Sequence, residues 1–299
     1  MLSICIPVYN TSIKSLIDSL YKQCIKCAIP FEIICIDDAS TLFKEENNSI
    51  TSYKEVSYSK LNQNVGRSVV RNLLAEKATY NTLLFLDSDV SIAENNFIQK
   101  YIDCVKKSIP VVVGGVSYSE NFSDATKKLH YTYGTKRESK LFSIRSKNMY
   151  SSFLTGNLLI QKKLVQEIQF LSLLKEYGHE DTLFCLELKK RSIPILHIDN
   201  PIVHEGLETN EVFVSKQLMA VKNLSFLIQH GYNMKGVSLF DSYLILKKYR
   251  LNNLYYYSFN LINHFCENAL KKGWTNWLVA FDALRLYKLL AFLKTKKQF

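Results

Sequence analysis

Two short apolar segments that each end in aspartates constrain the fold of this chain most. Residues 33–38 read Ile-Ile-Cys-Ile-Asp-Asp, and residues 83–89 read Leu-Leu-Phe-Leu-Asp-Ser-Asp. Apolar runs of this length, separated by helical patterns, are typical of buried strands in an α/β sheet. Such sheets bind ligands outside the carboxyl ends of their strands. The aspartates therefore predict a site for a metal ion and a polar ligand, and hence an enzyme.

The composition indicates a folded protein without a membrane-spanning segment. Apolar residues make up 47% of the chain, which excludes a disordered protein. No apolar run approaches the roughly 18–20 residues that a membrane-spanning helix needs. The first basic residue is Lys14, so the N-terminus lacks the charged start of a signal peptide. Seven cysteines, an odd number in apolar surroundings, argue against a disulfide framework, and we expect a cytoplasmic protein.

Strand and helix patterns alternate through the first two thirds of the chain. Strands are expected near 2–7, 32–38, 56–59, 82–87, 111–116, 157–160, 193–198 and 201–204. Helices are expected near 12–26, 67–78 and 182–190, and the pattern is helical from about 210 onward. This alternation predicts βαβ units and a mostly parallel sheet flanked by helices. We predict an α/β catalytic domain over 1–206 and a helical C-terminal extension over 207–299.

The sequence Asp87-Ser88-Asp89 is the strongest single indication of chemistry. Two carboxylates at positions i and i+2 beyond a strand can approach one hard cation together. Mg²⁺ and Mn²⁺ suit such oxygen ligands, and Mg²⁺ typically binds one or two carboxylates plus substrate phosphates. The alternative interpretation of the same residues is a polar turn after a strand.

Three further motifs accompany the acidic one in a fixed order. They are Pro7-Val8-Tyr9-Asn10, Asp37-Asp38-Ala39-Ser40, and Asn64-Val65-Gly66-Arg67 followed by Arg71. Together the four motifs resemble those of the inverting family 2 glycosyltransferases, and the resemblance covers about residues 1–206. It implies the Rossmann-like GT-A fold, a mixed and mostly parallel sheet. The nucleotide-sugar half would span about 1–116 and the acceptor half about 117–206.

The resemblance implies a role for each residue on the donor side. Pro7, Val8 and Tyr9 would line the nucleobase pocket, and Asp38 would accept a hydrogen bond from the base. Gly66 would allow close backbone approach, while Arg71 would face the base or the diphosphate.

The acidic motif and its neighbours complete the donor side. Asp87 would lie near the ribose with Ser88 beside it, and Asp89 would bind a divalent cation, Mn²⁺ or Mg²⁺, that bridges the two phosphates. Ala39 stands where the family commonly has glycine, and Val90 stands where another acid is frequent. These departures weaken any inference about the exact donor, although neither removes a proposed ligand.

The second half supplies the acceptor side of the resemblance. Gly178-His179-Glu180-Asp181 is similar to the family's Glu-Asp motif, which implies that Asp181 is the catalytic base. A histidine at the position of His204 would complete the metal shell through a neutral ring nitrogen. Thr155-Gly156-Asn157 would flank the acceptor pocket. The alternatives are ordinary acids in the first turn of a helix, a structural histidine and a plain turn.

The C-terminal extension is basic and aromatic. Residues 247–299 hold ten Lys and Arg against two acidic residues, a net charge of +8. Trp274, Trp277, Leu278 and Phe281 fall on one helical face, the spacing of an interfacial helix. We expect this extension to contact a membrane surface, which would place the enzyme peripherally on the inner face of the cytoplasmic membrane. The alternatives are helices packed on the core, and nucleic acid, for which no motif is present.

The combined features predict an inverting glycosyltransferase that uses a nucleotide-sugar donor, with a UDP-sugar as the expected donor. The acceptor would be a hydroxyl of a glycan or lipid-linked acceptor in surface polysaccharide assembly. One alternative is a nucleotidyltransferase, but the expected glycine-rich basic loop after the first strand is missing. Another is a non-catalytic membrane-associated scaffold with the same fold, although the carboxylates Asp89 and Asp181 are present. A dehydrogenase is disfavoured because no G-x-G-x-x-G sequence occurs.

Overall fold

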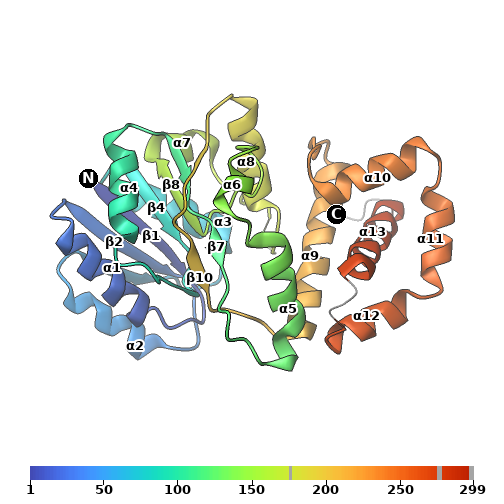
Figure 1. The fold of residues 1–299 in the computed structure, drawn as a ribbon, viewed down its shortest axis with the longest axis horizontal. Coiled ribbons are helices and arrows are strands. Elements are labelled where there is room, and N and C mark those ends of the chain that lie inside the picture. Colours follow the sequence, from blue (N-terminus) through green and yellow to red (C-terminus); the bar gives the residue numbers. More distant parts are fainter. Residues whose placement is uncertain (175–176, 275–277, 296–299) are drawn as a thin grey trace. The chain divides into compact units, whose positions relative to one another are not determined.

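A computed structural model describes residues 1–174, 177–274 and 278–295, and it divides into two compact units (Figure 1). The first, which we call the α/β unit, comprises 1–120, 134–175 and 183–206. The second, which we call the helical unit, comprises 121–133, 176–182 and 207–299. The helical unit thus takes in two segments that the sequence placed within the catalytic domain.

A seven-stranded sheet in the order β3-β2-β1-β4-β8-β6-β9 forms the centre of the α/β unit. Its strands are β1 (Leu2–Val8), β2 (Phe31–Asp37), β3 (Val56–Lys60), β4 (Thr82–Leu86), β6 (Val111–Val113), β8 (Asn157–Gln161) and β9 (Leu196–His197). The first four in spatial order run parallel to one another, and β8 runs antiparallel to both β4 and β6. The predicted α/β fold with a mixed, mostly parallel sheet is confirmed.

A second sheet joins three short strands in the order β5-β10-β7. They are β5 (Val90–Ser91), β10 (Ile202–His204) and β7 (Val116–Ser117). β10 runs antiparallel to β5 and parallel to β7. This small sheet brings the chain after the acidic motif beside the end of the last predicted strand.

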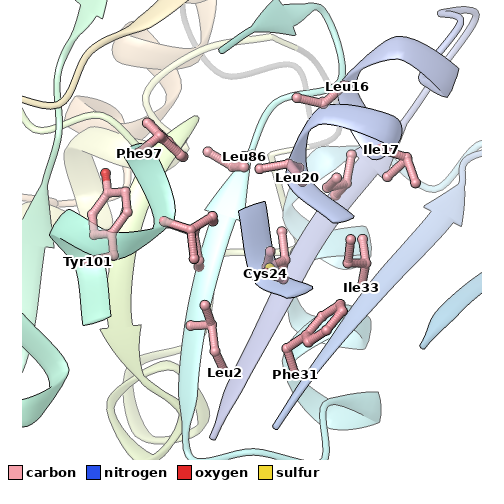
Figure 2. Packing of buried hydrophobic residues seen from close by; sticks show 14 of the residues in the cluster. Leu2, Leu16, Ile17, Leu20, Cys24, Phe31, Ile33, Leu86, Phe97 and Tyr101 are labelled. Atoms are coloured by element: carbon pink, nitrogen blue, oxygen red, sulfur yellow. The ribbon is translucent and has the colours of Figure 1, made fainter. Parts of the chain in front are cut away.

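Helices cover both faces of the large sheet. They are α1 (Lys14–Lys26), α2 (Lys44–Asn48), α3 (Arg67–Lys77), α4 (Phe97–Lys106), α6 (Phe142–Arg145), α7 (Lys162–Ile168) and α8 (Glu180–Lys190). Because side chains alternate along a strand, Ile4 and Ile6 pack with α1 and α4, whereas Cys5 packs with α3 and α7. Figure 2 shows the first of these clusters, where Leu20 and Cys24 of α1 lie over the strands.

The helical unit contains α5 (Lys128–Tyr133), α9 (Asn210–Gln229), α10 (Ser238–Lys248), α11 (Asn252–Asn260), α12 (Asn263–Lys271) and α13 (Leu278–Lys294). Within it, α13 packs against α9, α10, α11 and α12 (Figure 1). The side chain of Thr209 caps α9 by accepting a hydrogen bond from the Val212 amide. The core of this unit includes Phe213 and Val214 of α9 and Leu284 of α13.

The expected interfacial stripe at the end of the chain is wrong. Phe281 is fully buried in the core of the helical unit, and Leu278 packs against the same core. Trp277 lies outside the described residues. Trp274 precedes α13 and is 48% exposed, so of the expected stripe only Leu278 and Phe281 are seen to cover the protein's own core. Among the described residues, no helix combines the length and apolar character needed to cross a membrane.

Candidate active site

The loops after β1 and β2 are tied together by Asn10. This residue adopts a left-handed conformation with φ of 50°, which asparagine tolerates. Its side-chain oxygen accepts hydrogen bonds from the amides of Thr41 and Leu42, at 2.8 and 3.2 Å. The Asn10 amide in turn donates to the Ser40 hydroxyl at 2.8 Å. The neighbouring Tyr9 is 54% exposed, so its ring is available to a flat ligand at this edge.

Asp38 holds the loop that leads into α3. One carboxylate oxygen accepts from the Val65 amide at 2.7 Å and the other from the Gly66 amide at 2.9 Å. Gly66 precedes the first residue of α3 and has a φ of 86°, a conformation that glycine adopts without strain. Each carboxylate oxygen has a second lone pair, so Asp38 can still accept a hydrogen bond from a ligand.

Arg71 and Asp87 form an ion pair beneath the strand ends. The Arg71 guanidinium donates to Asp87 Oδ1 at 2.9 Å, and it also lies 5.7 Å from the centroid of the Phe170 ring. Only 2% of the Arg71 side chain is exposed, compared with 32% of Asp87. In this structure the buried arginine therefore orients the partly exposed carboxylate. Direct contact of Arg71 with a donor stays a prediction.

The other oxygen of Asp87 lies against Gly156. A Cβ atom on Gly156 would come within 2.2 Å of Asp87 Oδ2, closer than any real contact. The Gly156 carbonyl also accepts from the Asp87 amide at 3.2 Å. Gly156 is thus required for the placement of Asp87. Its neighbours Thr155 and Asn157 are fully buried, so they act inside the fold and not at an open pocket.

Asp89 and His204 meet through the small sheet. In its register His204 of β10 lies opposite Val90 of β5, the residue after Asp89. His204 Nε2 is 3.5 Å from Asp89 Oδ2. Gly206 makes room for this carboxylate, since a Cβ there would lie 2.2 Å from Asp89 Oδ2. The small sheet therefore brings together a carboxylate and a histidine that are far apart in sequence, and their role as metal ligands stays a prediction.

Charges around this pair act on both pKa values. Burial alone would raise the pKa of Asp89, but the hydrogen bond and charge of His204, with a smaller effect of Arg67, lower it overall. Burial would lower the pKa of His204, but Asp89, followed by Glu138 and Asp87, raises it overall. The site is therefore an acidic cluster that attracts a cation or a proton.

The Asp89–His204 pair fits a divalent cation that is shared with a substrate. Within residues 1–174, 177–274 and 278–295, no group of three His, Cys, Asp or Glu side chains could hold a metal ion. Mg²⁺ is commonly held by only one or two protein carboxylates together with substrate phosphates. One carboxylate and one imidazole, with a glycine that opens space beside them, match such a shared site.

Tyr118 and Glu138 were missed by the sequence analysis. The rings of Tyr118 and His204 lie with centroids 5.5 Å apart, and the Tyr118 hydroxyl donates to Glu138 Oε2 at 2.5 Å. Glu138 ends a π-helical turn, Gly134–Glu138, a rare element that is frequent at functional sites. No sequence motif surrounds either residue. The feature that points to them is the π-helical turn, which is visible in the structure.

The predicted base motif begins α8 and is grouped with the helical unit. Gly178 and His179 precede it with φ values of 105° and 72°. Burial, followed by the charge of Arg285, lowers the pKa of His179 to about 4. Glu180 is buried, and Asp181 follows it in the first turn of α8. The assignment of Asp181 as the base stays a prediction.

Helix α9 holds the backbone ahead of this motif. Asn223 Nδ2 donates to the carbonyls of Tyr177 and Gly178, at 3.1 and 3.2 Å. A Cβ on Gly178 would lie 2.5 Å from the Ala220 Cβ, so the chain packs directly on the helix. Helix α9 thus holds the chain that leads into the Glu180–Asp181 turn.

Comparisons with known proteins place this geometry in a family. The model of glycosyl transferase family 2 matches residues 3–174, more than half of the chain. A protein of Haemophilus influenzae described as an uncharacterized glycosyltransferase is 28% identical over 263 residues, covering 78% of this chain and 96% of that protein.

Solved structures share the fold at low sequence identity. A mannosyltransferase of Pyrobaculum calidifontis, in complex with GDP-Man and Mn²⁺, has a TM-score of 0.61 at 13% identity, covering 99% of this chain and 88% of that one. TarS 1–349 of S. aureus in complex with UDP has a TM-score of 0.51 at 17% identity, covering 97% and 89%. In another TarS 1–349 structure the chain spans 64% of the solved protein. With residues 3–174 matched, and with the motifs of the sequence gathered at the strand ends, the chain belongs to glycosyl transferase family 2.

Proposed function

We propose that this glycosyltransferase transfers a sugar, with inversion, from a UDP-sugar to a hydroxyl of a glycan or lipid-linked acceptor in surface polysaccharide assembly. The single observation that carries the proposal is the Asp89–His204 pair, 3.5 Å apart beside the Arg71–Asp87 ion pair. Both pairs lie where the strands of the α/β unit end. Family membership favours sugar transfer over the nucleotidyltransferase and scaffold alternatives.

The donor would bind along the loops after β1 and β2. Pro7, Val8 and the exposed Tyr9 would contact the nucleobase, and the remaining acceptor capacity of Asp38 would bind a base N–H. The Gly66 backbone would allow the nucleotide to come close. These loops are already cross-linked by Asn10, so donor binding would require little ordering of the site.

The acidic motif would hold the rest of the donor. Asp87, fixed by Arg71, would accept from the ribose hydroxyls with Ser88 beside it. Asp89 and His204 would hold a divalent cation, Mn²⁺ or Mg²⁺, on the diphosphate. When bound, that cation would neutralise the charge that develops on the departing nucleoside diphosphate. His204 must lose a proton to bind a metal, because the ligand is the neutral imidazole.

Asp181 would act as the base. An inverting transfer is a single displacement, in which the acceptor hydroxyl loses its proton as its oxygen attacks the anomeric carbon from the face opposite the leaving diphosphate. One carboxylate in the ionised form suffices for this task. The support for Asp181 is its place in the sequence Gly178-His179-Glu180-Asp181, which leads into α8.

The solved structures leave the nucleobase of the donor open to experiment. UDP occupies the TarS complex, whereas GDP-Man and Mn²⁺ occupy the mannosyltransferase complex. A screen of UDP-, GDP- and dTDP-sugars, with nucleotide release as the readout and Mn²⁺, Mg²⁺ or chelator added, tests the donor and the metal together. We expect release from UDP-sugars, abolished by chelator. Release that is indifferent to chelator would exclude the cation role of Asp89 and His204.

We further propose that the C-terminal helices contact a membrane surface, which would place the enzyme peripherally on the inner face of the cytoplasmic membrane. A lipid-linked acceptor would be reached there. The support is the net charge of +8 over residues 247–299, because anionic headgroups attract such segments.

A further inference from the structure

Helix α11 of the helical unit carries apolar side chains on two faces. Tyr255, Tyr256 and Phe259 pack against the core of that unit. On the other side, Leu254 is 66% exposed, and Leu261, which directly follows the helix, is 85% exposed. An amphipathic surface helix normally presents polar residues to water. The second apolar face of α11 therefore has no function within the helical unit itself.

Neighbouring segments extend this exposed apolar surface. The end of α10, the two connections of α11 and the start of α12 contribute further exposed apolar side chains. We define the outer helical face by Leu254 of α11 together with five residues of these neighbouring segments, Ile245, Leu251, Leu261, Ile262 and Phe265. Single exposed apolar residues are common, but a succession of them through α10, α11, α12 and the connections between these helices marks an interaction site.

The charge of this segment indicates its partner. No acidic residue occurs from Ser242 to Cys266, whereas Lys247, Lys248 and Arg250 are exposed there. We propose that the outer helical face binds the surface of an anionic lipid bilayer, with its apolar side chains in the interface and its basic residues on the headgroups.

Two observations favour a bilayer over a second copy of the chain. A symmetric dimer through this face would bring the same basic residues toward one another, which costs free energy, whereas anionic lipid compensates them. Tyr249 and Tyr257, both more than 60% exposed in the same segment, are of the type enriched at membrane interfaces.

This proposal deepens the proposed function by naming the surface that reaches a lipid-linked acceptor, and it rests on that function for its role. Vesicle binding is measured without donor or acceptor. A failure to bind vesicles would therefore be distinguishable from a failure to transfer sugar.

The test is sedimentation of the full chain with vesicles of phosphatidylcholine, with or without phosphatidylglycerol. We expect binding only with phosphatidylglycerol, and a roughly tenfold or greater loss for Leu254→Ser/Leu261→Ser. The matched control is Leu141→Ser/Leu173→Ser, which alters leucines of the α/β unit that are 72% and 67% exposed. It should bind as the unaltered chain does.

A second pair of variants tests the charge. Lys247→Glu/Lys248→Glu should weaken binding by roughly tenfold or more, and added salt should weaken it as well. Binding to neither vesicle, or equally to both, overturns the proposal. Light scattering that shows a dimer abolished by Leu254→Ser/Leu261→Ser overturns it in favour of a second copy.

An independent observation concerns Tyr118 in the α/β unit. β7 and β10 are parallel, with Val203 opposite Ser117, so Tyr118 follows β7 beside His204. Its ring lies against Gly134, where a Cβ would come within 2.2 Å of the ring. The same π-helical turn supplies Glu138, which accepts from the Tyr118 hydroxyl. Both ends of one turn therefore fix a single side chain.

We infer that Tyr118 is a positioning residue that holds the His204 ring in its orientation toward Asp89. Outer groups that orient a metal-binding histidine typically change metal affinity by about 10–100-fold. The inference rests on the proposed cation role of His204, which His204→Ala tests separately. If His204→Ala leaves Mn²⁺ binding unchanged, the proposed ligand is wrong and the role of Tyr118 falls with it.

The experiment measures Mn²⁺ binding by electron paramagnetic resonance with UDP present. Tyr118→Leu should weaken Mn²⁺ binding by roughly tenfold, and Tyr118→Phe, which keeps the ring, by less. Tyr232→Leu, a tyrosine of the helical unit, is the control and should have no effect. Unchanged Mn²⁺ binding in Tyr118→Leu overturns the inference. Tyr118→Phe and Glu138→Gln supply the comparison if Tyr118→Leu does not fold.

Discussion

In the α/β unit, strand register places the acidic side chains, whereas in the helical unit the packing of one helix places the turn that carries Asp181. Asp89 faces His204 because β5 and β10 pair at that point. The turn before Asp181 is held by two hydrogen bonds from Asn223 of α9. Strand pairing repeats along a backbone and tolerates many side chains, but the second arrangement depends on particular ones. We therefore expect the two units to respond differently to substitution.

The largest effect is expected from the two carboxylates with different proposed roles, Asp181 as the base and Asp89 as a cation ligand. Asp181→Asn should lower kcat by about 10²–10⁴-fold, because it removes the general base, while UDP binding stays unchanged. Asp89→Asn should instead weaken the Mn²⁺-dependent binding of UDP. Calorimetry of UDP binding with and without Mn²⁺, beside kcat measurements, separates the two. Normal transfer by Asp181→Asn would exclude Asp181 as the base.

The next effect concerns two glycines, Gly178 before the Glu180–Asp181 turn and Gly206 beside Asp89. Gly178→Ala would meet the Ala220 Cβ at 2.5 Å and would also strain a φ of 105°. We expect the free energy of unfolding to fall by about 2–3 kcal/mol, measured by urea denaturation. Gly178→Ala/Ala220→Gly should recover the part due to the clash. The absence of any recovery would contradict close packing of the turn on α9.

Gly206→Ala is the counterpart in the α/β unit. Its Cβ would displace Asp89, so we expect a roughly tenfold or greater rise in the Mn²⁺ concentration for half-maximal activity. Gly231→Ala is the control, because its Cβ would meet nothing within 4 Å, and its φ of 81° strains only a backbone segment away from Asp89. That variant should leave the Mn²⁺ dependence unaltered. An unchanged Mn²⁺ dependence in Gly206→Ala would show that the Asp89 carboxylate can move freely.

A smaller effect is expected from His179 of the helical unit. Its pKa is lowered from 6.5 to about 4, so between these values the unfolded state binds more protons than the folded state. The free energy of unfolding should therefore rise from pH 4 to pH 6.5 by about 1–3 kcal/mol. Above that range the contribution of His179 to stability should be complete. His179→Asn, which tolerates a positive φ, should flatten the rise. His264→Asn, on the exposed side of α12, is the control and should leave the rise unchanged.

The smallest effect is expected in a loop of the α/β unit. Ala39 has a left-handed φ of 63°, which costs an alanine about 1–2 kcal/mol. Ala39→Gly should therefore raise the free energy of unfolding by about 0.5 kcal/mol, after the greater entropy of the unfolded glycine chain is subtracted. Ala75→Gly in α3 should lower it by about 1 kcal/mol. A loss of stability in Ala39→Gly would show that this loop is not strained.

The strands of the α/β unit were predictable because their apolar runs are short, regular and bounded by polar turns. β1, β2 and β4 fall within two residues of the expected ranges, and the expected aspartates lie at the ends of β2 and β4. The strand expected near 193–198 is only the pair Leu196–His197. Short strands at a sheet edge carry too few residues for a period to be recognised.

The C-terminal stripe shows where a pattern misleads. An apolar face at helical spacing predicts burial of that face, but it does not say whether the burial is in a bilayer or in the protein. Phe281 is buried in the helical core, whereas Leu254 of α11 and Leu261, which directly follows that helix, remain exposed. Tertiary packing buried the apolar face of α13 and left one apolar face of α11 exposed to solvent.

The sequence by itself determined the α/β fold, the aspartates at the strand ends and the family, because each depends on residues close together in the chain. Only the tertiary structure decided that His204 meets Asp89, that Gly156 and Gly206 leave room for the two carboxylates, and that Tyr118 lies beside the histidine. These contacts join residues far apart in sequence through strand pairing. No local pattern records which strands will pair or which side chains will then touch.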